Sequence, residues 1–174
     1  MKIRRLSISM SLVLALSACV AGAPNINVSD SQAVTRAISI ERDDFKKIIN
    51  FQGPNASGTS DINLLIRAWK ADATGKITYQ IYVMDKYHSS GWRFYSTADD
   101  SNGNNLDTTV ISRKVVGCYS TGCTYNEHLA LNIEQEYLEK NQETGIRFKL
   151  SGKAGDKVFF IPSGYIKAFL SVAK

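Results

Sequence analysis

Apolar and polar residues alternate along much of the chain, which is typical of half-buried β-strands. Residues 62–68 place apolar side chains at every second position, and residues 77–83 repeat the pattern after a short turn. Both segments also carry apolar residues on the opposite face, so they predict central strands that are covered on both sides. A third segment, residues 92–95, follows a Ser-Ser-Gly turn. Together the three predict an antiparallel meander.

The same alternation continues through the second half of the chain. It predicts further strands over 106–116, 124–133, 146–150 and 158–161, and residues 45–51 predict an edge strand. Short helices are predicted after Asn132, ending at Gly145, and after Pro162.

The last segment is ambiguous between helix and strand. Its apolar side chains fit helical spacing at Ile166, Phe169, Leu170 and Ala173, and they also fit alternation at Ile166, Ala168, Leu170 and Val172. With the helix preferred, the expected fold is mainly β (α+β). It is an antiparallel sheet or sandwich of about seven to eight strands with one or two short helices.

The first 18 residues have a different composition from the rest of the chain. Lys2, Arg4 and Arg5 precede an apolar run that ends near Ala23. This is the pattern of a secretory signal peptide, and the run is shorter than the roughly 20 residues that a membrane-spanning helix needs. At its end, Leu16-Ser17-Ala18-Cys19 resembles the lipobox of bacterial lipoproteins.

The resemblance implies cleavage before Cys19 and a lipid on that cysteine, which would tether the chain to a membrane in the bacterial cell envelope. Val20 stands where an aspartate would imply retention in the inner membrane, so in a Gram-negative cell the periplasmic side of the outer membrane is expected. Ordinary secretion, with Ala21-Gly22-Ala23 as the cleavage site, is the alternative. The expected organisation is a signal peptide over 1–18, a flexible tether over 19–37 and a single β-rich domain over 38–174.

Charge argues against a nucleic-acid partner. Without residues 1–18 the chain has 156 residues, a normal length for one domain, with 18 basic and 16 acidic side chains. The resulting net charge of about +2 lacks the clustered Lys and Arg of a nucleic-acid-binding face.

Two further cysteines, Cys118 and Cys123, predict a disulfide in an exported chain. Thr121-Gly122 between them suits a tight hairpin turn, which would bring the two side chains within bonding distance. A metal site that recruits His128 and the distant His88 is the alternative, although such a set makes a poor zinc site.

No catalytic or cofactor-binding motif is recognisable. Glu127 and His128 are adjacent, but neighbouring residues of a strand point to opposite faces. The polar segment 98–106 does not have the spacing of a calcium loop, and its Asn102-Gly103 pair predicts a hairpin turn. No enzyme activity, cofactor or metal is therefore expected.

Aromatic residues concentrate between Trp69 and Tyr95, and four side chains are typical of a binding surface: Tyr82, Tyr87, Arg93 and Tyr95. The resulting hypothesis is a lipid-anchored envelope protein whose non-catalytic domain binds a protein partner in an assembly, accessory or inhibitory (immunity) role. The alternatives are a carrier or sensor of small ligands or glycans, and a cell-envelope hydrolase with a site assembled from distant residues.

Overall fold

The computed structural model describes residues 26–174. The predicted signal peptide, Cys19 and the first part of the predicted tether lie outside these residues. Among the residues that are described, no helix is long and apolar enough to cross a membrane.

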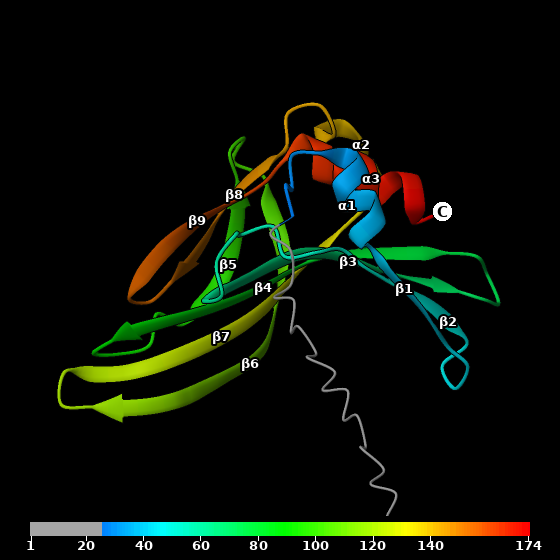
Figure 1. Cartoon of the computed structure of the whole chain (residues 1–174). Helices are drawn as coiled ribbons and strands as arrows, with labels where there is room; N and C mark the ends of the chain where they lie inside the picture. Colours follow the sequence, from blue (N-terminus) through cyan, green and yellow to red (C-terminus); the bar gives the residue numbers. More distant parts are fainter. Residues whose placement is uncertain (1–25) are drawn as a thin grey trace, which may run out of the picture.

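Nine antiparallel strands form one curled sheet in the order β1-β2-β3-β4-β7-β6-β5-β8-β9 (Figure 1). The mainly β, antiparallel prediction is therefore confirmed, with nine strands where seven to eight were expected. The strands are β1 Ser39–Asp43, β2 Ile48–Gln52, β3 Ile62–Ala71, β4 Ile77–Ser89, β5 Tyr95–Asp100, β6 Asn105–Tyr119, β7 Gly122–Ile133, β8 Ile146–Gly152 and β9 Gly155–Ile161.

Three helices lie together on one side of the sheet (Figure 1): α1 Ser31–Ala37, α2 Gln135–Asn141 and α3 Ser163–Val172. The helical alternative for the last segment is confirmed, because Ile166 and Phe169 of α3 are fully buried in the core. Two tyrosines join α3 to the sheet. Tyr165 Oη accepts from Ile66 N and donates to Pro54 O, while Tyr79 Oη donates to Ala173 O at 2.9 Å.

The folded domain begins earlier than predicted. The tether was expected to run to Ala37, but residues 31–37 form α1 and bury Val34 completely. Asp30 begins this helix, because its Oδ1 accepts from the backbone N–H groups of Gln32 and Ala33. A capping side chain in an otherwise polar segment is therefore the signal that marks this boundary.

The predicted meander is right for its first two strands and wrong for the third. β3 pairs with β4, with Leu64 opposite Val83, but the other neighbour of β4 is β7. Residues 92–94 precede β5, which pairs with β6 and β8 instead. The chain leaves β4 at this point because Glu127 of β7 holds the backbone of the segment, as described below.

One predicted turn and two predicted helix caps can be compared directly. Gly103 has a φ of 82° in the β5–β6 turn, which confirms the turn at Asn102-Gly103. Gly145 has the left-handed φ expected of it, 82°, but α2 already ends at Asn141 with Gln142 as its C-cap, so Gly145 lies beyond the end of the helix. Asn132 does not cap α2, because it lies in β7, and Glu134 is the residue before the helix.

Candidate functional site

The core-facing side of β4 and β7 changes from apolar to charged along the two strands. Asp85 and Glu127 are directly opposite each other in the pairing, and each is 0% exposed. Two like charges facing each other across a sheet are destabilising, and a buried carboxylate is costly unless it is fully paired. The surrounding residues must therefore compensate both.

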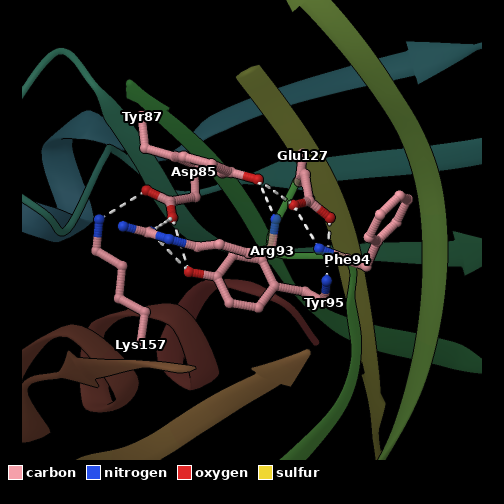
Figure 2. Close-up of polar contacts among 7 residues, drawn as sticks. All are labelled: Asp85, Tyr87, Arg93, Phe94, Tyr95, Glu127 and Lys157. Atoms are coloured by element: carbon pink, nitrogen blue, oxygen red, sulfur yellow. Dashed lines mark hydrogen bonds and ion pairs between the residues drawn. The ribbon is translucent and has the colours of Figure 1, made fainter. Parts of the chain in front are cut away.

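Asp85 is neutralised by groups from outside its own strand (Figure 2). Arg93 Nη1 donates to its Oδ2 at 2.9 Å, and Tyr95 Oη donates to the same atom at 3.1 Å. Lys157 Nζ of β9 donates to Oδ1 at 2.7 Å. These contacts attach β5 and β9 to the part of β4 that contains Asp85.

Glu127 holds the segment that leads into β5. Its Oε1 accepts from the Tyr87 hydroxyl and from Phe94 N, and its Oε2 accepts from Tyr95 N and from Arg113 Nε. Tyr87 Oη in turn accepts from Arg93 N at 2.7 Å (Figure 2). The Glu127 carboxylate thus fixes three consecutive residues. It accepts directly from the backbone of Phe94 and Tyr95, and it reaches the backbone of Arg93 through the Tyr87 hydroxyl.

We refer to Asp85, Glu127 and their partners Tyr87, Arg93, Tyr95, Arg113 and Lys157 as the buried network. Burial raises the pKa of the Tyr87 and Tyr95 phenols, so both remain hydroxyl donors at neutral pH. Both carboxylates are saturated by cations and hydrogen bonds, which makes the buried network a positioning device and a poor general acid or base.

The buried network positions a group of aromatic rings at the surface. Phe94 has a φ of 56°, which is unusual for a residue with a side chain. Its ring turns away from the carboxylates (Figure 2), and the residue is 39% exposed. Trp92 lies 6.0 Å from this ring and 4.5 Å from the ring of Tyr125. Arg113 and Lys153 lie over the Phe94 ring at 5.4 and 5.8 Å.

Valines of β6 extend this group along the same side of the sheet. Val110 and Val115 are opposite the core-facing Leu129 and Tyr125 of β7, so they share the side that carries Arg113, and both are exposed. We call the exposed and half-buried members of this group the Trp92 surface; they are Trp92, Phe94, Val110, Arg113, Val115 and Lys153, and the buried Tyr125 contacts Trp92 from the core side.

One edge of β6 has no neighbouring strand for most of its length. β5 pairs with β6 only at Asn105 and Leu106, and the described residues provide no second neighbour from Asp107 to Tyr119. We call this stretch the free edge of β6. Pairing with β7 shifts register between Val110 and Ser112 and between Val115 and Gly117, which indicates bulges at Ile111 and Val116.

The free edge carries an unusual number of exposed large apolar side chains. Val116 is 58% exposed and Tyr119 is 74% exposed; the others are Val110, Ile111 and Val115. Proteins normally protect long edges of this kind, because unpaired N–H and C=O groups are a template for another strand.

The four residues of the predicted binding face do not share one face. Tyr87, Arg93 and Tyr95 come together, but in the buried network, where both tyrosines are buried. Tyr82 lies on the opposite side of β4, because five positions separate it from Tyr87 and faces alternate along a strand. There its hydroxyl is 2.5 Å from His128 Nδ1.

The disulfide prediction is confirmed. Cys118 and Cys123 are bonded at the tip of the β6–β7 hairpin, with a Cα–Cα distance of 4.0 Å. His88 lies beside this tip, where its Nε2 is 3.2 Å from Thr121 Oγ1, while His128 faces Tyr82. Within residues 26–174 no three His, Cys, Asp or Glu side chains are grouped so that they would hold a metal ion.

Sequence reasoning missed the two central residues, although a signal was present. Asp85 occupies the core-facing position that follows Ile81 and Val83, and Glu127 occupies the one that precedes Leu129. A carboxylate at such a position requires a buried partner, and two of them on adjacent strands predict a network.

Comparison with known proteins provides no further assignment, since no protein-family model, no curated protein and no solved structure matches this chain.

Proposed function

We propose that this chain is a membrane-anchored envelope protein that binds a protein partner by strand addition along the free edge of β6. The observation that supports the proposal is the combination of an unpaired edge with five exposed large apolar side chains on the same strand. In strand addition the edge supplies backbone hydrogen bonds, and neighbouring side chains supply specificity.

The Trp92 surface fits this role because it lies on one side of the free edge. Phe94 is held by Glu127 of the buried network, and Trp92 packs against the rings of Phe94 and Tyr125, so a partner would not have to order them. Aromatic side chains and arginine are the residue types that contribute most at protein interfaces.

A glycan-binding role has weaker support. Trp69 and Tyr82 lie on the outer face of β3 and β4, but the Arg67 guanidinium lies over both rings, at 5.1 and 4.8 Å. Arg67 is itself held by Gln80 Oε1. A sugar would have to displace this stacked arginine before it could reach either ring.

The anchor is the second part of the proposal and rests on the lipobox residues alone. Several acyl chains on Cys19 would give stable attachment, since each buried methylene contributes about 0.8 kcal/mol. We expect the intact mass of the membrane-extracted chain to equal that of residues 19–174 plus lipid. A mass without lipid would contradict the anchor but would leave the proposed binding edge untested.

Partner binding is tested by a photo-cross-linking residue placed at Val115 in the full chain in cells. The matched control is Val158 on β9, which is 50% exposed, as is Val115. We expect one discrete adduct with an envelope protein from position 115 and none from position 158. Absence of an adduct, or the same adducts from both positions, would contradict strand addition at β6.

A second variant separates the edge from a general loss of folding. Val116→Glu introduces a charge at the bulge, whereas Val158→Glu introduces the same charge on β9. We expect only the first to abolish the adduct from position 115, while far-ultraviolet circular dichroism shows both chains folded.

A further inference from the structure

The free edge of β6 lies beside an excess of positive charge. The buried network contains two carboxylates, Asp85 and Glu127, and three cations, Arg93, Arg113 and Lys157. Lys153 adds a further cation at the Phe94 ring, and it forms no ion pair among residues 26–174. The Trp92 surface is thus cationic in a chain whose predicted mature form is close to neutral.

Among the cations of the buried network, Arg113 is the one nearest the free edge, because it belongs to β6 itself. Its Nε donates to Glu127 and its Nη2 donates to Tyr95 O, and no described residue accepts from Nη1. The side chain is 28% exposed. An incoming carboxylate would therefore find an oriented guanidinium N–H group, and charge-assisted hydrogen bonds of this kind are the strong ones.

Apolar contacts flank this arginine on the same side of β6. Val110 and Val115 lie on either side of Arg113 along the strand, Val115 is opposite Tyr125, and the ring of Tyr125 lies beside that of Trp92. In an added strand, side chains that face one side recur at every second residue. A carboxylate opposite Arg113 would thus place an apolar residue two positions away, opposite a valine.

We infer that the partner segment is an extended strand in which apolar and acidic side chains alternate on the face that contacts the Trp92 surface. This inference rests on the proposed function and specifies the chemistry of its partner. The positive charge repels a basic strand, so discrimination arises from repulsion as well as from attraction.

A second copy of this chain is a less suitable occupant of the free edge. β6 contains Arg113 and Lys114 near the middle of that edge, so pairing of two β6 strands about this point would bring cations together.

The test uses synthetic strands and the full chain extracted from membranes. One blocked peptide has the sequence Thr-Val-Thr-Glu-Thr-Val-Thr, which places Val, Glu and Val on one face, and the second replaces Glu by Lys. The chain has two tryptophans, so Trp69→Phe leaves Trp92 as a single fluorescent reporter in the proposed site. Calorimetry on the unsubstituted chain provides the same comparison without any change at Trp69.

We expect saturable changes in Trp92 emission with the Glu peptide and about tenfold weaker binding of the Lys peptide. Lys153→Glu should weaken binding of the Glu peptide severalfold. The matched control is Lys149→Glu on β8, whose ammonium group lies 3.9 Å from Asp156 rather than at the Phe94 ring, and it should leave binding unchanged.

The outcomes separate this inference from the proposed function. Equal binding of both peptides, or binding of neither while the adduct from position 115 forms in cells, would overturn the inferred charge pattern and leave strand addition standing. An adduct from position 115 whose mass is that of two copies of this chain would also overturn it. Loss of both the adduct and peptide binding would overturn the proposed function itself.

Discussion

The two halves of the paired strands β4 and β7 fill the same interior in opposite ways; we call the half that contains Ile81 and Leu129 the near half, and the half that contains Asp85 and Glu127 the far half. In the near half, Ile81 and Val83 of β4 face the interior with Leu129 of β7, and all three are fully buried. In the far half, Asp85 and Glu127 occupy the equivalent positions and are buried to the same degree. The partners differ accordingly, since α3 supplies Phe169 and Ile166 to the core, whereas the far half meets the side chains of the buried network.

This difference shows what each kind of interior specifies. Apolar burial stabilises in proportion to area and is non-directional, so the near half constrains volume more than orientation. The buried network has fixed donors and acceptors, and it specifies that the backbone of Phe94 and Tyr95 lies against Glu127 of β7, while the Tyr95 hydroxyl reaches Asp85 of β4. The far half therefore determines where the Trp92 surface is displayed.

Glu127→Ala, in the far half, is expected to cause the largest loss in the free energy of unfolding. The substitution leaves Arg113 without its carboxylate and two backbone N–H groups, of Phe94 and Tyr95, without their acceptor. Removal of one partner of a buried ion pair typically costs about 3–5 kcal/mol in the free energy of unfolding. Urea denaturation measures this loss, and Glu127→Gln, which keeps acceptor capacity, should lose less.

Leu131→Ala provides the apolar counterpart on the same strand. Leu131 is fully buried opposite Ile81, and truncation of such a residue costs about 2–5 kcal/mol. The near-ultraviolet circular dichroism of the folded protein separates the two variants. It should stay close to the wild type for Leu131→Ala and change for Glu127→Ala, because only Glu127 positions the segment next to Trp92. Identical spectra would show that the buried network does not position those rings.

Local patterns were sufficient to predict most of the strands. Alternation identified β3, β4, β7, β8 and β9, and helical spacing identified α3, because these elements bury a regular face of their own residues. Alternation also identified β6, although Leu106 is the one buried residue of that strand. The disulfide could also be predicted locally, because Cys118 and Cys123 are close along the chain.

The pairing of strands and the site depended on contacts that no local pattern contains. The chain leaves β4 after Ser89, and the distant Glu127 decides that residues 92–95 do not return along it. The predicted binding face grouped Tyr82 with Tyr87 and Arg93 by residue type alone. Tyr82 and Tyr87 are five positions apart on β4, so their side chains lie on opposite sides of the sheet. Application of strand alternation to those positions would have avoided that error.

Loss of the disulfide should have a smaller effect on stability, confined to the end of the β6–β7 hairpin. The chain-entropy model assigns about 2 kcal/mol to so short a loop. We expect Cys118→Ser with Cys123→Ser to destabilise the β6–β7 hairpin, which would show in faster hydrogen exchange of amides near Tyr119 and unchanged exchange near Leu131. Uniformly faster exchange would contradict a local role.

Titration of His128 should have the smallest effect, and it probes the outer face of the same strand. Burial, assisted by Lys114, lowers the pKa of His128, whose Nδ1 is 2.5 Å from the Tyr82 hydroxyl. The folded state therefore binds this proton less readily than the unfolded state, whose histidine has a pKa of about 6.5. Its contribution to stability is complete above that value and is lost as the pH falls below it.

The thermal midpoint measured from about pH 7.5 to 5.5 isolates this contribution, because most carboxylates titrate at lower pH. The wild type should lose stability towards the acidic end of this range, and His128→Gln should flatten the profile, since glutamine can accept from Tyr82 without gaining a proton. His88→Gln, at the exposed tip of the hairpin, should retain the wild-type slope. A slope that persists in His128→Gln would assign the pH dependence elsewhere. A slope that disappears would show that His128, on the outer face of β7, is the source of this pH dependence.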